Sequence, residues 1–538
     1  MEFPSLNLLP YNFASSAKKL LSDVIRDPYS RIAQPSQDEQ DIFPLALVSI
    51  LFIVGWYVIT WIRQPKLLGP HVGYRSWWEP TWILRLRFVT GARSIITRGY
   101  VEFKDAMFRI RRNDTDILII SNKYVDELRT MPDEKVTAIG AHIKNLLGHY
   151  STVDLLLESN LHTRILQGKL TPSLNKFIPR MHDELKFAMI DVPQAEDWTL
   201  VAPYEMCLRL VARISARVFL GLPVCRDEDW LEASIRYTEN IFQTVITLRA
   251  FPSVLHPFLV RLLPSWYRIH KNIATARRLI VPLMLSYREG IALGQDYTDE
   301  ERSTLLNWMI DEGVTDVETD PDKMAHRQLI MSLGAIHTTT MATVHMLYDI
   351  CAHPEYFEPL REEIQPVILG EDGLDKQSFL KMRKLESFMK ESQRLSPPSL
   401  LAFNRIVREE VRLSDGKILR KGEHIAVASA DILMDPSNVN DPEKFDPLRS
   451  YHKRQEEGES NKHLWAMTDS QNLHFGHGKY SCPGRFFASN EIKMLIAYLL
   501  TFYDFKYPAG QSRPQNFTAD ENIYPDPKAR LLMRRRVM

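Results

Sequence analysis

A single cysteine near the C-terminal end lies in a glycine-flanked loop. Phe475, Gly478, Cys482 and Gly484 follow the spacing F-x-x-G-x-x-x-C-x-G, and an apolar segment that suits a helix follows directly. Glycines permit tight turns, and N–H donors at the start of a helix favour a thiolate over a thiol. A sheltered thiolate is a strong ligand for haem iron. We therefore predict that Cys482 ligates haem iron and that Phe475 shields the sulfur from water; a buried, inert cysteine is the alternative.

A helix predicted over residues 324–352 has an unusual centre. Residues 334–340 read GAIHTTT, which puts a small pair close to three threonines. Glycine and threonine are poor helix formers in a helix interior, and hydroxyls that bond back to the preceding turn can bend a helix. The pattern indicates a functional site at the middle of the helix, with ordinary core packing as the alternative.

Together with two further motifs, these features resemble the cytochrome P450 family of haem-thiolate monooxygenases. Glu391-Ser-Gln-Arg394 resembles the family's E-x-x-R motif, and its two charges share one helix face. Phe445-Asp-Pro-Leu-Arg449 resembles the segment whose arginine completes a Glu–Arg–Arg cluster before the cysteine loop. The resemblance covers the chain after residue 63, and it implies this structural role for Glu391, Arg394 and Arg449.

The helix centre is similar to the family's oxygen-binding groove, A-G-x-[D/E]-T-T. The resemblance implies that Thr338 hydrogen-bonds iron-bound dioxygen and that Gly334 and Ala335 leave room for oxygen and substrate. His337 takes the place of the usual acid. Because histidine titrates at about pH 6.5, His337 either relays protons to the oxygen or only hydrogen-bonds its neighbours.

The resemblance also implies haem b (iron protoporphyrin IX) as the cofactor, held in part through its propionates. Tyr480 stands two residues before Cys482, at a position where the family often has Arg or His. A tyrosine donates one hydrogen bond but carries no charge at pH 7. Arg405 stands where the family commonly places a propionate-binding arginine. The family's usual Trp…Arg pair is not evident over residues 162–172, where Arg164 or Lys169 can substitute.

The implied activity is oxidation of a small apolar substrate with O₂. Electrons would come from a separate NADPH–cytochrome P450 reductase, since no Gly-rich dinucleotide fingerprint is evident in the chain. The I-H-T-T groove resembles fungal members that act on terpenoids, which favours a terpenoid or related polycyclic intermediate of secondary metabolism. Alternatives are a sterol or fatty-acid hydroxylase, an isomerase or dehydratase acting without O₂, and a non-catalytic haem sensor or carrier. The expected lining segments are residues 242–255, 333–338 and 399–403.

The elements that must position these residues are mainly helical, with a small β component. Helical periodicity covers residues 200–220, 272–293, 324–352 and 486–502, and residues 116–121 and 423–430 suit strands. The helix over 324–352 has Asp320 as its N-cap and Pro321 as its first residue. This pattern, with the resemblance, predicts one catalytic domain of the P450 fold.

An uncharged apolar run over residues 43–62 predicts one transmembrane helix, since it would span about 30 Å. Acidic residues precede the run and Arg63 and Lys66 follow it, so the positive-inside rule places the catalytic domain in the cytosol. We therefore expect a luminal segment over residues 1–42, the anchor, a hinge over 63–70 and the cytosolic catalytic domain over 71–538. The resemblance implies that the membrane is that of the endoplasmic reticulum.

The composition excludes several other classes of protein. The 538 residues include 67 Lys+Arg and 67 Asp+Glu, and 45% are hydrophobic. This balance is that of a globular protein and gives no support for disorder or for a nucleic-acid partner. Four widely spaced cysteines fit a reducing compartment rather than a disulfide framework.

Overall fold

The computed structural model describes residues 55, 68–370 and 373–537, and from Leu68 onward they form one compact unit. The predicted anchor over residues 43–62 lies outside the described residues apart from Gly55, as do residues 1–42 and residues 63–67 of the hinge. Within the described part, no helix combines the length and the apolar character needed to cross a bilayer. Residues 68–70 belong to the domain, because Arg109 N donates to Pro70 O (2.8 Å).

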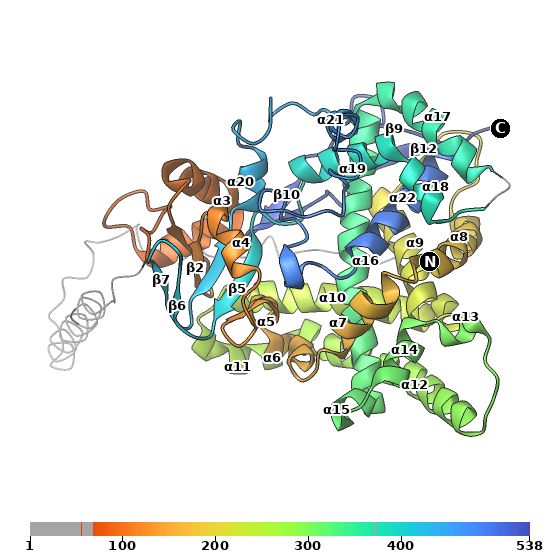
Figure 1. Cartoon of the computed structure of the whole chain (residues 1–538), viewed down its shortest axis with the longest axis horizontal. Coiled ribbons are helices and arrows are strands. Elements are labelled where there is room, and N and C mark those ends of the chain that lie inside the picture. The colour runs from red at the N-terminus through yellow and green to blue at the C-terminus, as the bar shows by residue number, and fades with distance from the viewer. Residues whose placement is uncertain (1–54, 56–67, 371–372, 538) are drawn as a thin grey trace, which may run out of the picture. The chain divides into compact units, whose positions relative to one another are not determined.

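The unit is mainly helical; strands β2 and β5 of the largest sheet lie toward the left in Figure 1, whereas β9 and β12 lie at the upper right. The helices of eight or more residues are α3 (Thr81–Phe103), α5 (Ala138–Asn145), α8 (Leu174–Ala188), α9 (Pro203–Phe219), α10 (Glu228–Arg249), α12 (Pro264–Ala292), α14 (Leu305–Glu312), α16 (Pro321–Ala352), α17 (Phe357–Ile368), α19 (Arg383–Leu395) and α22 (Arg485–Phe502). The shorter helices are α4 (Val125–Leu128), α6 (Gly148–Ser151), α7 (Leu161–Ile165), α11 (His256–Leu259), α13 (Asp299–Arg302), α15 (Asp316–Thr319), α18 (Lys376–Lys381), α20 (Ser429–Leu433) and α21 (Arg449–Lys453).

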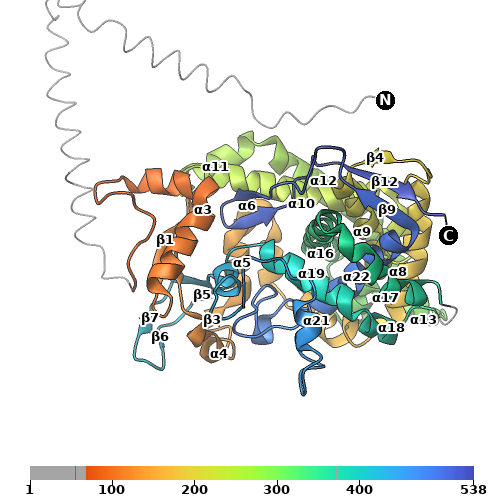
Figure 2. The same cartoon turned by 90° about the horizontal axis from the view of Figure 1, so that it is seen from above.

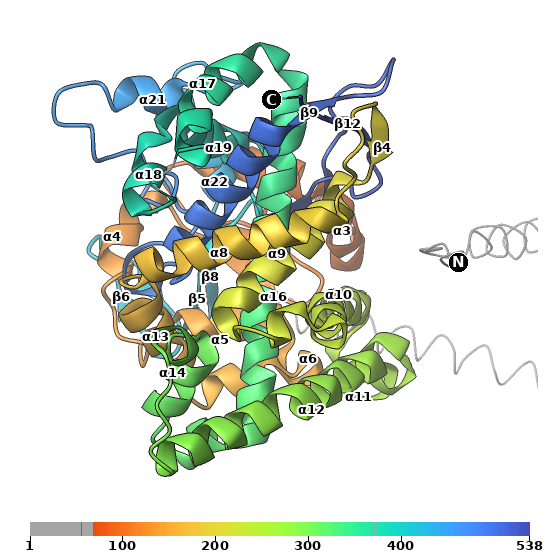
Figure 3. The ribbon, with the colours of Figure 1, turned by 90° about the vertical axis from the view of Figure 1, so that its right-hand side faces the viewer.

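Helix α16 runs through the middle of the helical part. Figure 2 shows it nearly end-on, and it contacts α9, α10, α12, α19 and α22. In Figure 3 α8 and α9 lie in front of it, while α12 lies along the lower edge. Asp320 caps the helix as predicted, its side chain accepting from Lys323 N (2.8 Å), and Pro321 is in the first turn. Because α16 touches so many elements, a side chain at its centre can reach the interior of the domain.

The largest sheet has five strands in the order β1 (Phe108–Arg111), β2 (Asp116–Ile119), β8 (His424–Val427), β5 (Ala402–Val407) and β3 (Val136–Thr137). Strand β2 pairs in parallel with β8, and the other neighbours are antiparallel. Alternate residues of β2 face opposite sides, as a period of two requires: Ile117 and Ile119 join the core under α3, whereas Leu118 packs with β5 and β8 residues on the other face.

Three small sheets complete the β part. They are β4 (Thr199–Val201) with β12 (Leu531–Arg535) and β9 (Tyr503–Lys506), the hairpin of β10 (Phe517–Ala519) and β11 (Asn522–Tyr524), and β6 (Val411–Arg412) with β7 (Ile418–Leu419). The mainly helical fold with a small β part is therefore confirmed. The predicted helical stretches correspond to α9, α12, α16 and α22, and the two predicted strands correspond to β2 and β8.

Candidate active site

The cysteine loop is held by its own backbone directly before α22. Cys482 N donates to Phe475 O (2.7 Å), and Ser481 N donates to Gly478 O (3.1 Å). The ring of Phe475 packs edge-on against Trp465, with ring centroids 4.8 Å apart, and joins the main helical core. Arg485, the first residue of α22, donates from Nη1 to Cys482 O (2.8 Å). The loop is thus a closed turn that presents one thiol.

The glycines of the loop are not equivalent. Gly478 has φ +75°, and a Cβ atom there would lie 2.8 Å from Cβ of Arg129, so a larger residue is excluded by both conformation and space. Gly484 has φ −90°, which any residue adopts, and no described atom lies within 4 Å of the position of its missing Cβ. The expectation of a tight glycine turn therefore holds at Gly478, whereas Gly484 borders open space.

Cys482 differs from the other three cysteines. Cys207, Cys225 and Cys351 are buried, and burial raises the pKa of Cys207 and of Cys225 to about 12. Cys482 is only partly buried. Burial raises its pKa as well, but the backbone N–H groups of Gly484 and Arg485 and the Arg485 cation act in the opposite direction. Those donors favour a thiolate at this position alone.

The predicted Glu–Arg–Arg cluster is present. Arg394 forms a two-pronged ion pair with Glu391, with Nη2–Oε1 at 2.7 Å and Nε–Oε2 at 2.9 Å. Arg449 Nε lies 3.4 Å from Glu391 Oε2, and Asp446 N donates to Glu391 Oε1 (2.9 Å). Arg394 Nη1 also donates to Pro442 O (2.6 Å). The cluster therefore fixes the segment over residues 442–449 on α19.

One face of α16 opens at its centre. Gly334 and Thr338, four residues apart and hence on one face, are exposed in a stretch whose neighbours Ile336, Thr339 and Thr340 are buried. No described atom lies within 4 Å of a Cβ built on Gly334. Thr338 Oγ1 donates back to Gly334 O (2.9 Å), and the helix continues without a break. The predicted groove is thus an accessible face inside the helical part.

His337 lies on another face of α16. Its Nδ1 is 3.3 Å from the Tyr204 hydroxyl, and its Nε2 donates to Ile235 O (3.2 Å). Burial lowers the pKa of His337 below its usual value. With both ring nitrogens engaged by α9 and α10, His337 joins α16 to its neighbours.

Arg405 and Tyr480 lie together next to the loop. The guanidinium of Arg405 is 4.0 Å from the Phe403 ring centroid and 5.4 Å from that of Tyr480. Phe403 is buried and takes a left-handed backbone conformation (φ 54°), a strained geometry for a phenylalanine. Among the described residues, Arg405 Nε, Arg405 Nη2 and the buried Tyr480 hydroxyl have no hydrogen-bond partner. Three buried donors thus lack an acceptor.

Comparison with known proteins decides the family. The family model described as "Cytochrome P450" matches residues 106–533. The chain belongs to the cytochrome P450 family. It is 55% identical to "Cytochrome P450 monooxygenase AN1598" of Emericella nidulans over 94% of each chain, and 42% identical to "Ent-kaurene oxidase" of Fusarium fujikuroi over 87% of this chain and 88% of that one. The P450 is therefore a monooxygenase that resembles fungal enzymes of secondary metabolism.

A solved structure supports the fold. The P450 aligns with "Retinoic acid bound cyanobacterial CYP120A1" at a TM-score of 0.63 and 18% identity, over 88% of this chain and all of that one. Family and fold imply a haem-iron cofactor, and the residues fit one. The partly buried thiol of Cys482 suits an iron ligand. The open space at Gly334 and Gly484 suits a flat ring, and the unpartnered donors of Arg405 and Tyr480 suit its carboxylates.

Sequence reasoning missed one neighbour of Arg405. His142 on α5 is exposed, yet its protein surroundings and the nearby Arg405 cation lower its pKa to about 4. No spacing in the sequence connects residue 142 with residue 405, so only the fold could reveal this pair.

Arg164 and Lys169 each form an ion pair with a carboxylate of another helix. Arg164 pairs with Glu318 (3.3 Å) and Lys169 with Glu312 (2.9 Å). The residue of this region that reaches the loop is Gln167, whose Nε2 donates to Lys479 O (3.4 Å). That either basic residue substitutes for the missing propionate partners stays a prediction; in this structure each pairs with a carboxylate of α14 or α15.

Proposed function

We propose that this P450 is a haem-thiolate monooxygenase that hydroxylates or further oxidises an apolar terpenoid or related polycyclic substrate. The observation that carries the proposal is the environment of Cys482, the one cysteine that is not buried and that receives backbone donors. Haem, when bound, supplies the iron centre at which O₂ is reduced and one oxygen atom is transferred to carbon.

Each residue of the site then has a defined task. The Cys482 sulfur would bind the haem iron: the Gly484 and Arg485 N–H groups act on the sulfur, and the Cys482 backbone is fixed by its own N–H, which donates to Phe475 O. Arg405 and Tyr480, whose buried donors have no partner among the described residues, would hold the haem propionates. The Thr338 hydroxyl, which donates to Gly334 O, is the group on the open face of α16 that can hand a proton to a bound oxygen. His337 positions α16 rather than carrying protons, since Tyr204 and Ile235 occupy its nitrogens.

The reduced, CO-bound protein tests the ligand assignment. Wild type should give the red-shifted Soret band of thiolate ligation, and Cys482→Ala should abolish it. Cys207→Ala is the matched control, because Cys207 is buried and lies on α9. A Cys482→Ala protein that keeps the band would show that another residue holds the iron.

The amount of product formed per NADPH consumed tests the role of Thr338 in oxygen activation. Thr338→Ala should consume NADPH with less product, because the open face of α16 loses its hydroxyl. Thr340→Val is the control: Thr340 also donates to a carbonyl four residues back, Ile336 O (2.7 Å), but is buried. Product formation that is independent of O₂ and reductase would favour the isomerase or dehydratase alternative.

The terpenoid assignment rests on relatives, since a protein 42% identical to this one is named an ent-kaurene oxidase. Mass spectrometry of the ligand that copurifies with the P450 would test it directly. A sterol or a fatty acid in that fraction would favour the corresponding hydroxylase.

The electron donor in this proposal is NADPH–cytochrome P450 reductase, and the location is the endoplasmic reticulum membrane with the catalytic domain cytosolic. The apolar run over residues 43–62 is the anchor. Three tryptophans shortly after it support the membrane assignment: Trp77, Trp78 and Trp82 are 96%, 71% and 63% exposed, and interfacial tryptophans are common near membranes. Deleting residues 1–62 should move the protein from the membrane pellet toward the soluble fraction.

A further inference from the structure

Strand β5 carries a charged residue on its buried face. Phe403, Arg405 and Val407 are the buried residues of the strand, and the residues between them are half-buried. Arg405 is only 2% exposed, and arginines are almost never fully buried unless they are paired. Its place in an otherwise apolar row of side chains therefore needs a physical reason.

Arg405 has no carboxylate partner among the described residues. Burial lowers the pKa of Arg405 to about 10, while Tyr480 and Asp133 act in the opposite direction, so the side chain stays charged at pH 7. Asp133 is engaged elsewhere, because its carboxylate pairs with Arg408 (3.3 Å). A buried cation without a paired anion destabilises a fold. An anion that the chain does not itself supply would therefore stabilise this site.

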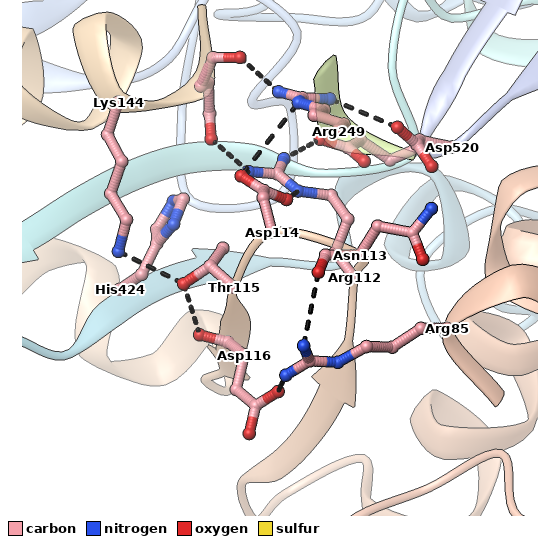
Figure 4. A network of polar contacts seen from close by, with 12 residues as sticks. Arg85, Arg112, Asn113, Asp114, Thr115, Asp116, Lys144, Arg249, His424 and Asp520 are labelled. Atoms are coloured by element: carbon pink, nitrogen blue, oxygen red, sulfur yellow. Dashed lines mark hydrogen bonds and ion pairs between the residues drawn. The ribbon is translucent and has the colours of Figure 1, made fainter. Parts of the chain in front are cut away.

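A β-bulge shapes the strand next to Arg405. The register between β5 and β8 shifts between Ala402 and Arg405, so that two residues of β5 lie opposite one residue of β8. His424, the histidine of β8 labelled in Figure 4, donates from Nε2 to Asn404 Oδ1 (3.0 Å) and so holds the bulge to β8. Bulges re-aim side chains and are common next to active sites.

Phe403, within this bulge, has a strained backbone. Its φ is +54°, in the left-handed region that a bulky side chain rarely adopts. Its side chain is buried with Leu118 and Ile425, on the face of the sheet opposite α3. Such strain persists only where the surrounding structure enforces it, and it is concentrated at functional sites. The conformation of Phe403 thus suggests a task for its side chain beyond filling the core.

The Phe403 ring lies against the Arg405 guanidinium. The guanidinium carbon is 4.0 Å from the ring centroid, well within the range in which an aromatic face attracts a cation. Nη1 donates to Asn404 O (2.8 Å). The other two nitrogens, Nε and Nη2, form one edge of the guanidinium and have no partner among the described residues. A planar edge with two parallel donors matches a carboxylate.

We propose that Phe403 is a positioning residue for haem: its ring seats the Arg405 guanidinium so that the Nε–Nη2 edge stays free for a carboxylate of the cofactor. The inference rests on the proposed function, since it assumes that a haem carboxylate reaches Arg405. The strained backbone at Phe403 is then the geometry that brings the ring against the cation. Without the ring, Arg405 keeps its charge but loses the surface that fixes its plane.

The rate of haem loss to excess apomyoglobin tests this role in the haem-loaded, full-length P450. Phe403→Leu keeps an apolar side chain in the core but removes the aromatic face. Haem loss should become about tenfold faster than in wild type, the order expected for a desolvated cation–π contact. Phe403→Met serves if the leucine variant does not fold, because a flexible thioether chain fills the same space without a ring.

Phe88→Leu is the matched control. Phe88 is also buried, and it packs from α3 on the opposite face of the same sheet. The same substitution there should leave haem loss at the wild-type rate. Equal acceleration in Phe88→Leu, or unchanged haem loss in Phe403→Leu, would overturn the inference.

A double substitution separates positioning from general stability. Arg405→Met should accelerate haem loss, and adding Phe403→Leu should change the rate no further, because both residues act on one contact. A second acceleration in the double variant would show that Phe403 only stabilises the fold, and it would overturn the positioning role.

Resonance Raman spectra provide a readout besides haem loss, the bending band of the haem carboxylates. The band should shift in Phe403→Leu and in Arg405→Met, and it should stay unchanged in Phe88→Leu. Haem loss and a band that are both unchanged in Arg405→Met would refute the task given to Arg405 in the proposed function. A response to Arg405→Met without one to Phe403→Leu would refute only the role of Phe403, so the two failures are distinguishable.

Discussion

Two of the buried ion clusters of this P450 differ in how the chain supplies their members. In the cluster of Glu391, Arg394 and Arg449, one carboxylate faces two guanidinium groups, and the ion pair at its centre spans three residues of one helix. In the Arg249 cluster, which consists of Arg112, Asp114, Asn145, Arg249, Asp520 and Glu521, three carboxylates face two guanidinium groups from segments hundreds of residues apart (Figure 4). The first fixes a loop next to α19, whereas the second fixes the relative positions of whole elements.

The difference explains why one cluster was predicted and the other was not. A glutamate and an arginine at i and i+3 on a helix are neighbours by geometry, so their pairing can be read from the sequence. Arg112 and Glu521 meet only because the β1–β2 turn and the β10–β11 hairpin converge. Nothing in the spacing of either residue indicates the other.

The largest effect is expected for Glu391→Gln. This change leaves Arg394 and Arg449 without their shared carboxylate in a buried site, so the free energy of unfolding should fall by about 5 kcal/mol. Haem-loaded yield should fall with it. Glu358→Gln is the control, because Glu358 is exposed and pairs at the same spacing with Arg361 (2.8 Å), which keeps Asp504 as a second carboxylate partner. Comparable loss in both variants would show that the Glu391 cluster is no more important than a surface pair.

Arg112→Met should cost less, about 3 kcal/mol, because Arg249 remains to neutralise part of the carboxylate charge. Thermal unfolding of the haem-loaded protein measures it. Arg112→Lys should recover only part of the loss, since a single ammonium cannot reproduce contacts to Asp114, Asn145 and Glu521 together. A fully stable Arg112→Met protein would show that the contacts of Arg112 to Asp114, Asn145 and Glu521 do not stabilise the fold.

Asp520→Asn should lower stability by about 1 kcal/mol, since the amide keeps the shape and a weaker hydrogen bond to Arg249. Combining it with Arg249→Met should then add little, because the two residues share one interaction (3.1 Å). Additive losses in a double-mutant cycle would mean that the two side chains stabilise the protein independently.

The smallest effect is expected for Arg236→Ala, at most about 0.5 kcal/mol, because its ion pairs with Glu232 and Glu239 are exposed. Unfolding in urea measures it. A loss as large as that of Asp520→Asn would indicate that exposed pairs on α10 matter as much as the buried cluster.

Local patterns were sufficient for much of the architecture and for part of the site. A few neighbouring residues were enough to predict each of four features: the cap at Asp320, the long helix α16, the strands β2 and β8, and the turn at Gly478. The direction of a side chain around a helix was harder to infer. His337 is one residue from Thr338, yet it bonds Tyr204 and Ile235 from other helices, and only tertiary packing could decide between its two roles.

The contrast among the four cysteines has a practical consequence for the bench. Cys207, Cys225 and Cys351 are buried, so an alkylating reagent applied to the native, haem-free chain has one accessible sulfur to modify, Cys482. A sulfur bound to iron would be protected from the same reagent. Counting the alkyl groups per chain by intact mass would therefore report what fraction of a preparation has never acquired its prosthetic group.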